Sequence, residues 1–120
     1  MYDVRHVLRK AGLRSTYSGY NYLASAVALV LKDQEFYLKN VTSNLYRVVG
    51  EQYGVSNNMA VKLYGKYGDE IYIRTMINSY WNQNSNKILS PLLGYPVFDK
   101  PTASEFISML ADYIQDHSSR

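Results

Sequence analysis

Cysteine is absent from the 120 residues, which excludes disulfides, thiolate metal sites, iron–sulfur clusters and cysteine nucleophiles. Histidine is scarce, because only His6 and His117 are present, and neither is followed three or four residues later by a second metal-binding side chain. The chain also lacks the phosphate-binding loop, the dinucleotide-binding glycine motif and the serine-hydrolase elbow. The sequence therefore predicts a protein that is not an enzyme and that uses no metal ion, cofactor or small-molecule substrate.

Long hydrophobic runs are missing as well. The longest run, Leu23–Leu31, is interrupted by Ser25 and is far shorter than the roughly 20 residues that a bilayer crossing needs. The first residues carry charge at once and have no apolar stretch behind them of the kind found in a secretory signal. We therefore expect a cytoplasmic protein with no membrane contact.

Negative charge is scarce over most of the chain. Residues 1–98 contain 11 Lys and Arg against 6 Asp and Glu, a balance of +5, whereas residues 99–120 have a balance of −2. A basic body favours a polyanion such as nucleic acid as the partner. The 13 tyrosines are interpreted as half-buried helix residues, because a tyrosine can pack its ring and still hydrogen-bond through its hydroxyl group.

The apolar residues recur with helical periodicity along nearly the whole chain, and no segment alternates with period two for long. The fold class predicted from this pattern is all-α, with six to eight helices in a single domain over residues 1–120. The expected helices cover about 2–11, 18–33, 35–40, 42–54, a stretch from 56, 69–81, 87–93 and a last stretch from 102.

Several residues predict where these helices begin and end. Gly12 and Gly94 follow predicted helices, and Thr42 and Asp69 are predicted N-caps. The strongest signal is Thr102 with Glu105 three residues later, which is a capping box. The apolar residues predicted to face inward from this last helix are Phe106, Met109, Leu110 and Ile114.

The segment from about 42 to 65 has the spacing of a helix-turn-helix. Gly50 fits the crossing of the two helices, Gly54 fits the turn, and Ser56 would cap the second helix. The residues at the expected buried positions are Val49, Tyr53, Val55, Ala60 and Leu63. An ordinary helical hairpin within a bundle fits the same pattern, and the pattern by itself does not separate the two.

The second helix of this pair would expose a polar face. Its residues include Asn57, Asn58 and Lys62. Asparagine can form two hydrogen bonds with adenine, and lysine can reach guanine or a phosphate. These residue types at this spacing therefore favour contact with base edges in the major groove.

Four stretches extend the pattern to nearly the whole chain: Gly19–Ala26 with Asp33 beyond it, Thr42–Tyr46 with Gln52 and Tyr53 beyond it, Leu93–Tyr95, and Lys100–Asp112. With these stretches the sequence resembles, from about residue 4 to 117, the C-terminal DNA-binding effector domain of the sporulation-initiation master response regulator family of Firmicutes. The resemblance implies a cytoplasmic regulator of transcription that binds double-stranded DNA, as a homodimer or as tandem copies. We expect a stand-alone domain or one excised from a longer regulator.

The chain departs from the family pattern between Tyr53 and Trp81, where it is longer. Alignment forward from Tyr53 places Asn57, Asn58, Lys62 and Lys66 on the DNA-contacting stretch, with an insertion around residues 65–69. Alignment backward from Trp81 places Glu70 and Arg74 there. We favour the forward alignment because the turn glycine and Ser56 belong to it. The candidate DNA-contacting residues are Ser56, Asn57, Asn58, Lys62, Lys66, Arg47 and Arg74.

Two hypotheses about function follow from these observations. The first is sequence-specific binding of duplex DNA in transcriptional regulation. The alternative is a protein-interaction module that kept the fold, lost or altered DNA binding, and pairs with a full-length regulator. The alternative is motivated by the family arginines that are missing from the recognition region.

Overall fold

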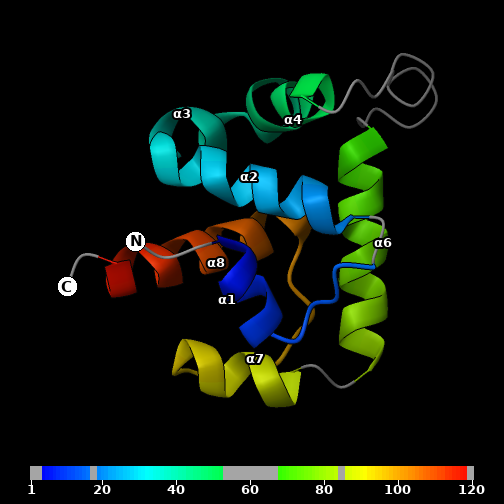
Figure 1. The fold of residues 1–120 in the computed structure, drawn as a ribbon, viewed down its shortest axis with the longest axis vertical. Helices are drawn as coiled ribbons and strands as arrows, with labels where there is room; N and C mark the ends of the chain where they lie inside the picture. Colours follow the sequence, from blue (N-terminus) through cyan, green and yellow to red (C-terminus); the bar gives the residue numbers. More distant parts are fainter. Residues whose placement is uncertain (1–3, 17–18, 53–67, 84–85, 119–120) are drawn as a thin grey trace.

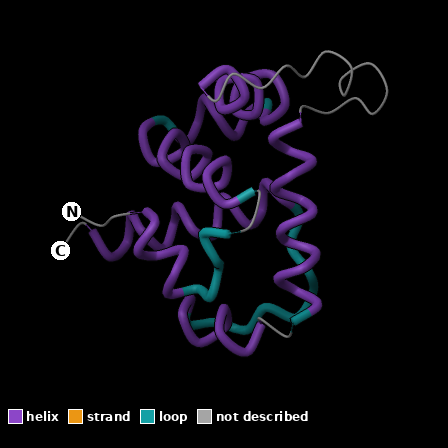
Figure 2. The backbone as a smooth tube through the Cα atoms, turned by 45° about the vertical axis from the view of Figure 1, so that its right-hand side comes forward, coloured by secondary structure: helices purple, strands orange, loops and turns teal. Residues whose placement is uncertain are grey.

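The computed structural model describes residues 4–16, 19–52, 68–83 and 86–118, and every regular element within these ranges is helical (Figure 2). The predicted all-α fold is therefore confirmed. The helices are α1 (Val4–Lys10), α2 (Tyr20–Lys32), α3 (Gln34–Lys39), the π-helix η1 (Val41–Tyr46), α4 (Arg47–Gln52), α6 (Gly68–Asn82), α7 (Asn86–Leu93) and α8 (Ala103–Ser118). No helix in the described ranges is long and apolar enough to cross a membrane.

The helices surround α2, which crosses the middle of the molecule (Figure 1). Helix α2 packs against α1, α3, η1, α4, α6 and α8. Helix α6 stands upright beside α2 and α8, with α3 and α4 at one end of the molecule and α7 at the other (Figure 1). The C-terminal end of α8 lies on the side away from α6 (Figure 1). A central helix with neighbours on several sides needs a wide apolar face, and α2 buries six residues: Tyr20, Leu23, Ala24, Ala26, Val27 and Val30.

Buried tyrosines tie the N-terminal segment to the rest of the fold. The hydroxyl group of Tyr80 in α6 donates to the carbonyl oxygen of Ala11 at 2.5 Å, and the hydroxyl group of Tyr20 donates to the carbonyl oxygen of Arg5 at 3.2 Å. Each of the two tyrosines is about 1% exposed. These two residues are fully buried and not half-buried as the sequence predicted, but each combines a packed ring with a satisfied hydroxyl group as expected.

The helix ends follow the sequence signals with two exceptions. Gly12 and Gly94, after α1 and α7, have φ angles of 92° and 83°, a left-handed conformation that glycine adopts without steric cost. By contrast, η1 begins at Val41 and α6 at Gly68, so Thr42 and Asp69 lie inside helical segments and not at the predicted N-cap positions. At the start of η1 the backbone carbonyl of Asn40 accepts from the amide of Asn44 at 2.8 Å, so the helical hydrogen bonding begins ahead of Thr42.

The capping box that begins α8 is present as predicted. The amide of Glu105 donates to the Thr102 hydroxyl oxygen at 3.2 Å, and the amide of Thr102 donates to the Glu105 carboxylate at 2.9 Å. The backbone hydrogen bond from Thr102, and then its side chain, hold the pKa of Glu105 below its ordinary value. Behind this cap, Phe106, Leu110 and Ile114 are buried, and Met109 is half-buried against the core.

Helices α2 and α6 approach so closely at Gly19 that a side chain there would meet the backbone of the other helix. A Cβ atom at Gly19 would lie 2.6 Å from the carbonyl oxygen of Tyr72 and 3.1 Å from the Cα of Ile73. Both atoms belong to the α6 backbone and cannot rotate away, so an added methyl group would push the helices apart.

We expect Gly19→Ala to lower the free energy of unfolding by about 1–3 kcal/mol, the usual cost of overpacking. At an uncrowded position the same change would be neutral or stabilising, because alanine restricts the unfolded chain. Urea unfolding followed by circular dichroism measures the difference. A variant as stable as the wild type would contradict the close packing of α2 on α6.

We expect Thr102→Ala to cost about 1 kcal/mol of unfolding free energy, because the amide of Glu105 loses its acceptor. Ser108→Ala, within the same helix, is the control and should change stability by less than about 0.5 kcal/mol. The box needs an ionised Glu105, whose folded pKa is lowered. Its contribution is therefore complete above the unfolded pKa and is lost as the pH falls through the folded one. Thermal unfolding at neutral and acidic pH checks both statements.

Candidate nucleic-acid interface

Helix α4 carries the first half of the predicted helix-turn-helix. It packs against α2, η1 and α6. Val49 and Gly50 are buried, as the predicted pattern requires of the residues at the crossing. Leu45 and Tyr46, at the end of η1, are buried too, so a continuous apolar side of η1 and α4 faces the core. On the opposite side of α4, Arg47, Glu51 and Gln52 are exposed.

The second half of the predicted motif lies outside the described residues. This applies to the turn residue Gly54 and to the predicted buried residues Tyr53, Val55, Ala60 and Leu63. It applies equally to five of the seven candidate DNA-contacting residues, which are Ser56, Asn57, Asn58, Lys62 and Lys66. The described candidates are Arg47 on α4 and Arg74 on α6.

Arg47 and Arg74 differ in their electrostatic surroundings. The guanidinium of Arg47 is 3.2 Å from the carboxylate of Glu51, one turn along α4, and both side chains are more than half exposed. Arg74 is also exposed, but it forms no ion pair within the described part of the chain. The charge of Arg47 is therefore shared with a carboxylate on its own helix.

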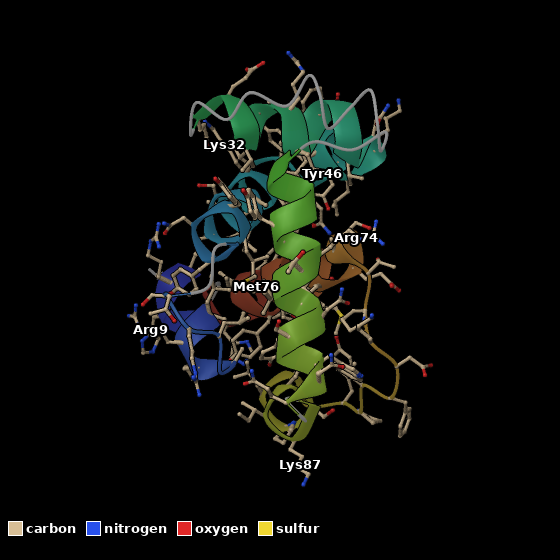
Figure 3. All side chains as sticks on the ribbon, turned by 90° about the vertical axis from the view of Figure 1, so that its right-hand side faces the viewer. Arg9, Lys32, Tyr46, Arg74, Met76 and Lys87 are labelled. Atoms are coloured by element: carbon tan, nitrogen blue, oxygen red, sulfur yellow. The ribbon has the colours of Figure 1, made fainter. Side chains whose placement is uncertain are left out.

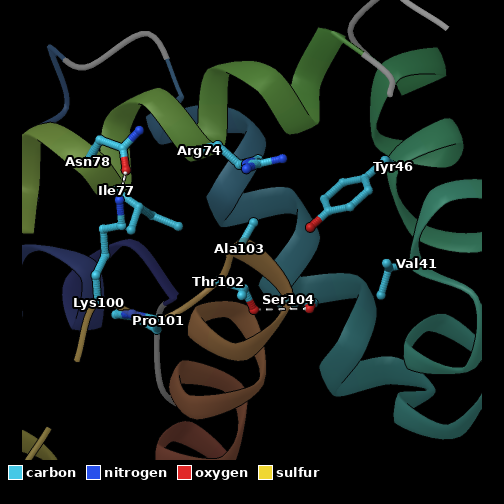
Figure 4. A pocket seen from close by; sticks show the side chains of 10 residues that line it. All are labelled: Val41, Tyr46, Arg74, Ile77, Asn78, Lys100, Pro101, Thr102, Ala103 and Ser104. Carbon is cyan, nitrogen blue, oxygen red and sulfur yellow. Dashed lines mark hydrogen bonds between the residues drawn. The ribbon is translucent and has the colours of Figure 1, made fainter. Parts of the chain in front are cut away.

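Arg74 borders a cleft of about 360 Å³ between α6, the start of α8 and the end of η1 (Figure 4). We call it the α6–α8 cleft. Arg74 extends from α6 toward Tyr46, whose hydroxyl group points into the cleft (Figure 4). The other lining residues are Val41, Ile77, Asn78, Lys100, Pro101, Thr102, Ala103 and Ser104. No carboxylate is among these lining residues, so the two charged residues that line the cleft, Arg74 and Lys100, are both positive.

Lys100 is the functional candidate that the sequence interpretation did not single out. Its ammonium group donates to the side-chain oxygen of Asn78 on α6 at 2.6 Å. This hydrogen bond holds the positive charge of Lys100 beside α6. Lys100 lies directly before Pro101 and the capping box, in the stretch that resembles the family most specifically. That position could have suggested a role, but the sequence contains no sign that this loop folds against α6.

Other chemistry is sparse in the described part of the chain. No group of three or more His, Asp or Glu side chains there could hold a metal ion. His117 at the end of α8 stacks on Tyr113, and its Nδ1 lies 2.8 Å from the Tyr113 carbonyl oxygen. This contact is local to one helix and builds no pocket.

A comparison with known protein families identifies the family of this chain. Residues 4–114 match the model of the family described as Sporulation initiation factor Spo0A C terminal. The chain belongs to this family. The Spo0A C-terminal family is a DNA-binding effector domain family that acts in transcription regulation during sporulation and is not an enzyme family. The resemblance seen in the sequence is thereby confirmed over nearly the whole chain.

Proposed function

We propose that this chain binds duplex DNA in a sequence-dependent manner and regulates transcription. The match of residues 4–114 to the Spo0A C-terminal family carries the proposal. The basic balance of residues 1–98 and the exposed arginines on α4 and α6 support it, because both suit a partner with a phosphate backbone. A role in the cytoplasm, where such DNA would be available, follows from the proposal.

The base-contacting element in this proposal is the helix that begins at Ser56. It would enter the major groove as the second helix of a helix-turn-helix over about residues 42–65, with Asn57, Asn58 and Lys62 toward the base edges. Asn58 and Lys62 are four residues apart and so share one face of a helix. These groups suit the recognition of adenine and guanine.

The remaining candidates would hold the protein on the backbone of the duplex. Arg47, Lys66 and Arg74 would contact phosphates, which fix the orientation of a protein on DNA without selecting sequence. Of the two described candidates, Arg47 shares its charge with Glu51, and Arg74 borders the α6–α8 cleft. Binding as a homodimer or as tandem copies would place two such helices on successive half-sites.

The test compares Asn58→Ala, Lys62→Ala and Arg74→Ala on a duplex selected from a random pool and on random duplex. We expect loss of Asn58 or Lys62 to reduce discrimination by roughly 1–3 kcal/mol, because a base contact is removed. Arg74→Ala should weaken both duplexes equally, as the loss of a phosphate contact does. Lys87→Ala, on α7 at the opposite end of the molecule from α4, is the control for charge (Figure 3).

Two outcomes would contradict this proposal in different ways. If only Arg74→Ala abolishes the preference for the selected duplex, then α6 contacts the bases and the backward alignment from Trp81 is correct. If the wild type binds no duplex at all, the DNA-binding proposal is wrong. The interaction-module hypothesis, with a full-length regulator as partner, then takes its place.

Duplex binding should depend strongly on salt. With about four to six phosphate contacts, affinity should fall by about two to three orders of magnitude between 50 and 200 mM salt, because each contact releases condensed counterions. Fluorescence anisotropy on a labelled duplex over a salt series measures the slope. An affinity that does not change with salt would indicate a partner other than a polyanion.

A further inference from the structure

We infer that the α6–α8 cleft is a seat for one phosphate group of the DNA backbone, with Lys100 and Arg74 as its cationic walls. The inference deepens the proposed function and rests on it. It adds Lys100 and the start of α8 to the DNA-contacting surface, neither of which belongs to the predicted helix-turn-helix.

Both cations border the cleft at α6. Arg74 and Asn78 are four residues apart and so lie on one face of the helix. Lys100 donates to Asn78 at 2.6 Å, which holds its ammonium group against α6, and Arg74 extends from the same helix toward Tyr46 (Figure 4). Both side chains line the cleft, so an anion within it would be attracted by both charges.

The rest of the cleft offers hydrogen-bond donors. The hydroxyl groups of Thr102 and Ser104 lie 3.4 Å apart beside the cleft (Figure 4). The Tyr46 hydroxyl group points toward the cleft from the opposite side, but it is itself buried. The nearby carboxylate of Glu105 accepts the amide of Thr102 in the capping box and does not line the cleft. Protein–DNA interfaces bind phosphate oxygens through positively charged side chains and hydroxyl groups, and this cleft offers both without a carboxylate.

The position of the cleft favours a phosphate within a duplex over a free anion. Figure 3 shows Arg74 on the half of α6 nearest α4, on the flank below the end of the molecule that carries α3 and α4, whereas Lys87 lies at the opposite end. The described residues of the predicted helix-turn-helix belong to that same end of the molecule. A duplex contacted by that motif would therefore pass its backbone along this flank.

The first experiment compares Lys100→Gln with Lys87→Gln, which makes the same change of charge on α7, at the opposite end of the molecule from α4. We expect Lys100→Gln to weaken binding to selected and random duplex alike by roughly 3- to 10-fold and to lower the salt slope by about one. Lys87→Gln should change neither quantity. Circular dichroism of both variants verifies that the fold is unchanged, since Lys100 is exposed.

The second experiment identifies the phosphate. Each phosphate of the selected duplex is replaced in turn by a neutral methylphosphonate. The wild type should lose affinity at several positions, and the Lys100→Gln variant should be insensitive at one of them, because the partner of that phosphate is already gone. If no position depends on Lys100 although the wild type binds DNA, the inference is wrong and the proposed function stands.

A titration with inorganic phosphate tests whether the cleft binds a free anion instead of a phosphate of DNA. Two results together would overturn the assignment to DNA and make the cleft a site for a free anion. The first is a saturable change in the NMR amide shifts of Thr102–Ser104 on addition of inorganic phosphate. The second is a duplex affinity that Lys100→Gln leaves unchanged. A wild type that binds no duplex overturns this inference and the proposed function together.

Discussion

The close packing of α2 against its neighbours is the constraint on which the other helices depend. Six residues of this helix are buried, and its first turn comes so near to α6 that only glycine fits at position 19. Because α2 contacts α1, α3, η1, α4, α6 and α8, a shift of α2 would move nearly every other element. The close contact at Gly19 therefore fixes the position of α6 relative to α2.

Hydrogen bonds from buried tyrosines add direction to this packing. Burial of apolar surface is not directional, whereas the Tyr80 hydroxyl group must meet the carbonyl oxygen of Ala11. That contact joins the last turn of α6 to the residue that follows α1, 69 residues earlier in the chain. The ring of Tyr80 also packs on Phe106 of α8, with centroids 5.6 Å apart. Helix α6 is thus fixed against both the first and the last helices.

The candidate surface is a consequence of this fixed α6. Its buried face holds Ile73, Met76, Ile77 and Tyr80, so Arg74 and Asn78 are left on the outer side. The capping box then determines where α8 begins, and the loop before it brings Lys100 within hydrogen-bonding distance of Asn78. Thr102 therefore has two roles. It caps the start of α8, and it lines the cleft beside the positively charged Lys100.

The sequence by itself determined the helical class, most helix boundaries, the capping box at Thr102 and the family. These features are local or depend on periodicity, so neighbouring residues are enough to specify them. The positions of Arg47 and Arg74 on exposed helix faces also followed from sequence.

Only the tertiary structure decided which distant residues meet. Lys100 and Asn78 are 22 residues apart, and neither carries a local signal for the other; their contact exists because α8 and α6 both pack against α2. The π-helical start of η1, which places Thr42 inside a helical segment, likewise could not be read from the capping pattern. Sequence periodicity shows which face of a helix is buried, but the packing of helices in three dimensions determines which exposed faces become neighbours.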